Sequence, residues 1–235
     1  MITRRGLLKA AGALPLAAAT AGTRLKIVVT GGHPGDPEYG CGGTIARLTE
    51  LGHEVTLLYM NRGEKHCPAA PDDPGAMVRT AEARKACEIL KARAVFAPQC
   101  DAHAIVDNAH YDEFRSLLEA ERPNAVFTHW PLDQHRDHVA ISALTHDAWL
   151  RMGKKYALFY YEVAEDTMMF PPAEYVDISS VEDRRRAACY AHASQTPDHF
   201  YPAQVQISKF RGSESGYAQA EAFLRHVQSP PFALP

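Results

Sequence analysis

The segment LKIVVTGGHPGDPEYGCGGT, residues 25–44, decides the fold of this 235-residue chain. It begins with an apolar, β-branched run that stops at Gly31. A short continuous apolar run that ends at glycine is typical of a buried parallel strand. A helix is expected over residues 44–51, where apolar side chains recur at helical spacing and Gly52 can end the helix. A strand followed by a helix is the repeating unit of an α/β sheet.

The same alternation continues towards the C-terminus. Further strands are expected over residues 54–59, 94–96, 124–128 and 156–161, and further helices over residues 76–90, 111–121 and 137–152. This order predicts a single parallel sheet flanked by helices, because successive β-α-β units wind in one sense. The Pro- and Gly-rich segment 67–75 is expected to be a surface loop.

Length and composition restrict the class of protein. A chain of 235 residues is long enough for one well-packed domain and short for two. Hydrophobic residues make up 46% and charged residues 23%, which is a globular composition and argues against disorder or a membrane bundle. The net charge is −3 and no basic patch alternates with aromatic residues, so no nucleic-acid partner is expected.

The first 21 residues have the pattern of an export signal. Twin arginines stand within residues 3–9, an apolar stretch follows over 10–19, and small residues at 19–21 are typical of a peptidase site. An N-terminal helix is the alternative, and the apolar run is too short for a membrane anchor. We expect residues 1–21 to be a twin-arginine signal peptide and residues 22–235 to be a single exported domain, periplasmic or extracellular, with no stable membrane anchor.

The five cysteines are widely spaced and form no C-x-x-C pair, so neither a cysteine-rich zinc knuckle nor a disulfide scaffold is expected. One bridge can form in an oxidising compartment, but the sequence does not select it. Cys41 lies in a predicted Gly-rich turn. It is either a nucleophile or a small buried side chain, and we favour the second interpretation.

Unusual polar residues follow two of the predicted strands. The first strand is followed by HPGDPE, residues 33–38, and the fourth by HWPLDQHRDH, residues 129–138. Ligands of open α/β sheets bind at the carboxyl ends of the strands. The glycines of residues 31–43 do not fit the G-x-G-x-x-G pattern, which disfavours a nucleotide-binding turn. Three histidines and two aspartates in ten residues also make a chance polar loop improbable.

Together the two segments predict a metal site. His33 and Asp36 are three residues apart in a turn, and His138 adds a third ligand at the start of the next helix. Imidazole and carboxylate suit Zn²⁺, which in catalytic sites takes three protein ligands and leaves a position for water. Such a metal lowers the pKa of its water to roughly 7, which makes a nucleophile at neutral pH.

These residues resemble the LmbE-like, PIG-L-type deacetylases, which remove N-acetyl groups from GlcNAc-containing substrates. The first motif of that family, H-P-D-D with a downstream acidic residue and glycines, is similar to residues 33–44, and its second motif, H-x-D-H, matches residues 135–138. Similar segments occur at residues 61–64, 78–82, 175–195 and 211–223, so the resemblance covers nearly all of the mature chain. With the strand–helix alternation, it implies an α/β fold, a Rossmann-like three-layer sandwich with a mainly parallel sheet.

The resemblance also implies roles for single residues. His33, Asp36 and His138 match the zinc ligands. His135 matches the histidine that stabilises the tetrahedral oxyanion and protonates the leaving amine. Asp137 matches the carboxylate that orients a site histidine, which fixes its tautomer and ring direction.

The implied cofactor is Zn²⁺, and the implied partner is a small-molecule or glycan substrate with an N-acetylated amino sugar. Arg79 matches an arginine expected near the substrate. A solvated charge on a helix face is the alternative for this residue.

Gly35 departs from the family motif, because it stands where the motif has the aspartate that activates the water. Glycine accepts no proton, and loss of a general base typically costs about 10²- to 10⁴-fold in rate. Three alternatives remain. Asp133, or with less support Glu38, reaches the water; His135 makes both proton transfers; or the chain is an exported zinc-containing carbohydrate-binding protein with little or no deacetylase activity. We favour the hydrolase, because the rest of both motifs is retained.

Overall fold

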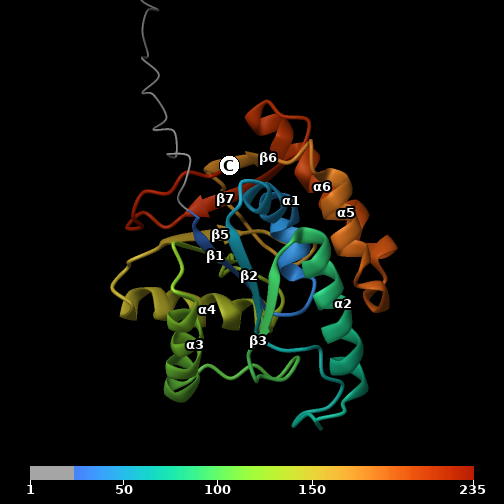
Figure 1. Ribbon diagram of the computed structural model, residues 1–235, viewed down its shortest axis with the longest axis vertical. Helices are drawn as coiled ribbons and strands as arrows, with labels where there is room; N and C mark the ends of the chain where they lie inside the picture. The colour runs from blue at the N-terminus through green and yellow to red at the C-terminus, as the bar shows by residue number, and fades with distance from the viewer. Residues whose placement is uncertain (1–23) are drawn as a thin grey trace, which may run out of the picture.

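The computed structural model describes residues 24–235 and shows one seven-stranded sheet with helices on both faces (Figure 1). The predicted signal peptide, residues 1–21, lies outside the described residues and stays a prediction. No helix within residues 24–235 is long and apolar enough to cross a membrane.

Five parallel strands make up most of the sheet, in the order β3-β2-β1-β4-β5. They are β1 (Lys26–Gly31), β2 (Glu54–Tyr59), β3 (Arg93–Phe96), β4 (Ala125–His129) and β5 (Ala157–Tyr161). Beyond β5 the sheet continues with β7 (Ala220–Arg225), which pairs antiparallel with β5, and then with β6 (Glu174–Asp177), which pairs antiparallel with β7. The mainly parallel α/β sandwich predicted from the sequence is therefore confirmed.

The helices form the two outer layers (Figure 1). One face is covered by α1 (Asp36–Glu50), α2 (Pro74–Leu90) and α5 (Glu182–Tyr190), with α6 (Pro197–Ser215) beside β7. The opposite face is covered by α3 (Asn108–Glu121) and α4 (Arg136–Arg151). A short 3₁₀ helix, Ala193–Gln195, joins α5 to α6.

Strand β1 is buried on both faces, which explains its continuous apolar run. Ile27 and Val29 belong to the apolar layer that includes Ile45 of α1, whereas Val28 packs in the layer that includes Leu144 of α4. Burial on both faces is the usual environment of a strand in the middle of a parallel sheet.

The predicted Gly-rich turn around Cys41 is wrong, because helix α1 begins at Asp36 and contains the whole glycine cluster. The glycines let this helix pack against its neighbours at a distance that no side chain permits. A Cβ on Gly40 would lie 2.4 Å from Tyr161 Cδ2, and a Cβ on Gly43 would lie 2.4 Å from Ile178 Cγ2. Cys41 is fully buried among these contacts, which agrees with the structural role that we favoured.

The strand order reverses between β1 and β4, since the chain runs outward from β1 to β3 and then returns to β4 on the other side. Such a reversal leaves a crevice at the carboxyl ends of the two strands, where ligands of these folds bind. The segments that follow β1 and β4 meet at this crevice.

Candidate active site

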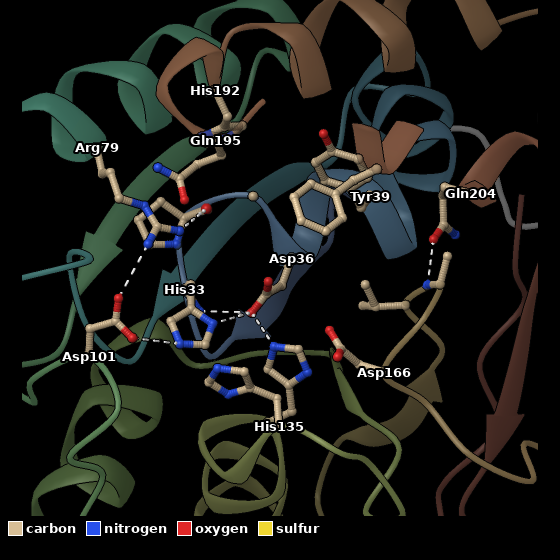
Figure 2. Close-up of a pocket in the computed structure, with 16 residues that line it drawn as sticks. His33, Asp36, Tyr39, Arg79, Asp101, His135, Asp166, His192, Gln195 and Gln204 are labelled. Atoms are coloured by element: carbon tan, nitrogen blue, oxygen red, sulfur yellow. Dashed lines mark hydrogen bonds and ion pairs between the residues drawn. The ribbon is translucent and has the colours of Figure 1, made fainter. Parts of the chain in front are cut away.

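A cavity of about 260 Å³ lies at the carboxyl ends of β1 and β4 (Figure 2). The loop after β1 and the start of α1 contribute residues 33–36 to its wall, and α4 with its N-cap contributes His135 and His138. Tyr39 and Phe200 supply apolar surface to the same wall. Polar groups that converge in a partly apolar hollow are typical of a small-molecule site.

The three predicted zinc ligands face one another in this cavity. Asp36 Oδ2 is 3.3 Å from His33 Nδ1 and 3.2 Å from His138 Nε2, and the two imidazole rings are 5.4 Å apart between centroids. Ligands held tetrahedrally at 2.0–2.1 Å from zinc are about 3.3 Å from one another. The two contacts of Asp36 have this spacing. Among residues 24–235, donor atoms that lie within 4.8 Å of one another form two overlapping groups around His138, one of His33, His135 and His138 and one of Asp36, His129 and His138, so the cluster can offer a metal imidazole and carboxylate ligands.

His129, the last residue of β4, is also part of this cluster, a contact that the sequence analysis did not predict. Its Nε2 is 3.2 Å from Asp36 Oδ2 and 3.4 Å from the amide nitrogen of Gly32. Complete burial and the neighbouring charge of His138 lower its pKa to about 4. His129 is therefore neutral at pH 7 and helps to fix the Asp36 carboxylate.

Two buried carboxylates lie behind the facing histidines. Asp133 Oδ1 is 3.0 Å from His138 Nδ1, and Asp137 Oδ2 is 3.1 Å from His33 Nε2. Both carboxylate side chains are fully buried. Partners of this kind fix the tautomer and direction of a metal-binding imidazole.

Neither carboxylate considered as a replacement base is part of the cavity wall. Asp133 uses its second oxygen to accept a hydrogen bond from Thr167 Oγ1 at 3.0 Å. Glu38 is completely buried, and its Oε1 accepts from Tyr59 Oη at 2.6 Å and lies 2.9 Å from His192 Nε2. Both carboxylates therefore hold neighbouring side chains, and neither is placed to take a proton from a water in the cavity.

His135 lies on the cavity wall, 4.5 Å from His33 and 4.8 Å from His138 between ring centroids. Its Nδ1 accepts a hydrogen bond from the amide of Asp137 at 3.2 Å, which leaves the ring proton on Nε2. Burial and the charges of His33 and His138 lower the pKa of His135. A neutral ring with an Nε2–H is suited to donate a hydrogen bond to an oxyanion.

Arg79 is 13% exposed and lines the cavity, so the interpretation as a solvated helix-face charge is wrong. Its Nη2 donates to the carbonyl oxygen of Pro34 at 2.9 Å, and its Nη1 lies 3.4 Å from Asp101 Oδ2. Asp101 Oδ1 is in turn 3.2 Å from His33 Nε2. Asp101 was not among the residues predicted from the sequence, although a carboxylate shortly after the third predicted strand was a usable signal.

Opposite charges are concentrated around the predicted ligands. Burial opposes ionisation of His33, but Asp36, Asp101 and Asp137 raise its pKa well above the usual value. Asp36 and Asp133 similarly outweigh burial at His138 and raise its pKa to about 9. These carboxylates therefore make the cluster attractive to a cation.

Gly35 has a backbone conformation, φ 118° and ψ −41°, that other residues rarely adopt. A Cβ at this position would find no atom closer than 3.9 Å, with His192 and Tyr39 as its nearest neighbours. Backbone conformation, and not lack of space, therefore disfavours a side chain at position 35.

The fold and the site define an α/β protein with a His₂Asp cluster suited to a metal at the switch point of its sheet. The family described as GlcNAc-PI de-N-acetylase, PIG-L, matches residues 28–149, which is just over half of the chain. The chain belongs to the PIG-L family, as the resemblance of its motifs predicted.

Several relatives match over most of their length. The probable N-acetyl-alpha-D-glucosaminyl L-malate deacetylase 2 of Bacillus cereus is 26% identical, with 84% of this chain and 96% of the relative covered. The diacetylchitobiose deacetylase of Thermococcus kodakarensis is 25% identical, with 83% and 81% covered. The conserved protein TT1542 from Thermus thermophilus is 27% identical in sequence. Its crystal structure superposes with a TM-score of 0.75 over 88% of this chain and 97% of that protein.

Proposed function

We propose that this protein is a zinc-dependent hydrolase that removes an N-acetyl group from an amino-sugar-containing substrate. The observation that carries the proposal is the convergence of His33 Nδ1 and His138 Nε2 on Asp36 Oδ2 within the cavity. Membership of a deacetylase family and relatives named for glucosaminyl and chitobiose substrates support the reaction and the substrate class. Export through residues 1–21 remains part of the proposal on the basis of sequence alone.

His33, Asp36 and His138 would hold the metal, which when bound polarises the amide carbonyl and acidifies a water. Asp133, Asp137 and His135 act through their own side chains. Asp133 and Asp137 keep the rings of His138 and His33 in their facing orientation. His135 presents Nε2–H to the carbonyl oxygen as negative charge develops there, and such donors in a water-poor site contribute strongly to catalysis.

Hydrolysis of N-acetylglucosamine and N,N′-diacetylchitobiose tests the function, with acetate release measured before and after treatment with a chelator. We expect activity that the chelator removes and zinc restores. His135→Ala should retain zinc but lower kcat/KM by about 10²-fold or more, because one oxyanion donor is lost. A protein that binds these sugars with zinc in place and releases no acetate would instead be the carbohydrate-binding protein considered above.

Zinc binding is expected to release at least one proton per site at pH 7. The pKa of His138 is raised to about 9, so this ring carries a proton at pH 7 in the metal-free protein, whereas zinc binds the neutral ring. The apparent zinc affinity should therefore fall as the pH decreases below 8. Each displaced proton contributes a factor of about ten for every pH unit. Calorimetry at pH 7 in buffers of different ionisation enthalpy measures the release, and equal heats in all buffers would contradict it.

A further inference from the structure

Three carboxylates line the cavity: those of Asp36, Asp101 and Asp166. Two of them already have side-chain partners. Asp36 contacts the histidine cluster, and Asp101 contacts His33 and Arg79. The side chain of Asp166 has no hydrogen bond or ion pair among residues 24–235, and only burial and more distant charges act on it. Figure 2 shows Asp166 and Asp101 on opposite sides of Asp36.

From this placement we propose that Asp166 is the general base of this protein and does the work of the aspartate that Gly35 replaces. The inference rests on the proposed deacetylase function and adds a catalytic residue to it. The sequence offered no sign of this role, because Asp166 is outside both motifs.

The loop that carries Asp166 is hydrogen-bonded to Asp133 and Gln134, which precede the predicted ligand His138 in the chain. The backbone oxygen of Asp166 accepts from the amide of Gln134 at 2.9 Å, and the oxygen of Glu165 accepts from Gln134 Nε2 at 2.7 Å. On the other side, Thr167 Oγ1 donates to Asp133 Oδ2 at 3.0 Å. These three hydrogen bonds hold the backbone on both sides of Asp166 beside the cavity, while its carboxylate has no partner among the described residues and faces the cavity. A reacting group on a fixed backbone is already positioned for its substrate.

The surroundings of Asp166 also make it a stronger base than an exposed aspartate. Burial is the main cause and raises the pKa of Asp166. A carboxylate whose pKa is closer to neutral takes a proton more readily.

Asp166 takes up one proton in the proposed reaction and later returns it. The water oxygen forms a bond to the amide carbon while one O–H bond breaks and its proton passes to the Asp166 carboxylate. The π electrons of the carbonyl move to its oxygen, which accepts the hydrogen bond from His135 Nε2–H. The carbonyl then re-forms, the C–N bond breaks, and the amine nitrogen takes the proton back from Asp166. Neutral His135 does not need to lose its own proton, which agrees with its lowered pKa.

Asp166→Asn tests the proposal, with Glu165→Gln as the matched control because Glu165 is the exposed neighbour on the same loop. We expect Asp166→Asn to lower kcat/KM for N,N′-diacetylchitobiose by about 10²- to 10⁴-fold. Zinc content and the affinity for N-acetylglucosamine should stay within about threefold of the wild type, and Glu165→Gln should leave all three quantities unchanged.

A binding measurement gives a second readout that does not need turnover. The ammonium group of glucosamine should lie against the Asp166 carboxylate, so Asp166→Asn should weaken glucosamine binding to the zinc-loaded protein by roughly tenfold or more. If Asp166→Asn keeps kcat/KM within threefold of the wild type, the assignment is overturned. If the wild type deacetylates no sugar, the proposed function fails, and equal glucosamine affinities in wild type and variant then overturn the role of Asp166 separately.

Discussion

Asp36→Ala is expected to remove stoichiometric zinc and to lower kcat/KM by about 10³-fold or more. Asp36 Oδ2 is the atom on which His33 and His138 converge, and two imidazoles alone rarely hold zinc. Loss of the metal removes several kcal/mol of transition-state stabilisation, and about 1.4 kcal/mol corresponds to each factor of ten in rate. Metal analysis of the purified variant and acetate-release kinetics measure the two effects.

Two further variants make this result specific. Asp72→Ala removes an exposed carboxylate that is not part of the site and should leave zinc content and rate unchanged. Asp36→Asn keeps an oxygen that can accept the hydrogen bond from the His33 amide, now at 2.8 Å, but lacks the negative charge. We expect it to bind zinc far more weakly while its far-ultraviolet circular dichroism spectrum stays that of the wild type. Full zinc occupancy in Asp36→Ala would show that the metal site has been assigned to the wrong residues.

Glu221→Ala is expected to destabilise the fold by about 3–5 kcal/mol, because it removes two buried hydrogen bonds and one of the two carboxylates that face the buried Arg185, the other being Glu182 at 3.1 Å. Glu221 is on β7, where its two oxygens accept from the amides of Gly43 and Thr44 at 2.8 and 2.7 Å. Its Oε1 is also 3.4 Å from Nε of Arg185, a side chain with no exposed surface. The free energy of unfolding from denaturant titration measures the loss.

Glu174→Ala is the matched control for this change. Glu174 on the adjacent β6 pairs with Arg225 at 2.8 Å, but both side chains are about a third exposed, so the pair should contribute about 1 kcal/mol or less. If the two variants lose the same stability, the buried contact of Glu221 with α1 is not important for the fold. Glu221 matters for the site as well, since α1 begins with Asp36.

The sequence alone was sufficient for those parts of the fold that depend on local pattern. The apolar runs of the first five strands were correctly located, and so were the helices between them apart from the start of α1, which begins at Asp36 and not at residue 44. Their order brought the segments after β1 and β4 to one edge. That juxtaposition is why His33 and His138 were expected to face each other.

Features that depend on tertiary contact could not be predicted in this way. Glycines 40–43 indicate a turn by propensity, yet they are helical because Tyr161 and Ile178 require close packing there. The antiparallel pairing of β7 between β5 and β6 joins segments far apart in the chain. Asp166 is outside both motifs, and only the folded loop after β5 brings it to the cavity.

The conformation of Gly35 has a consequence for the history of the site. In a lineage whose loop has settled at φ 118°, an aspartate cannot return to position 35 by a single substitution without strain in the backbone. In such a lineage, selection for activity would act more readily on other positions around the cavity than on position 35. Members of the family that share this glycine should accordingly share their compensating acid with one another, and should form a branch apart from those that keep the aspartate.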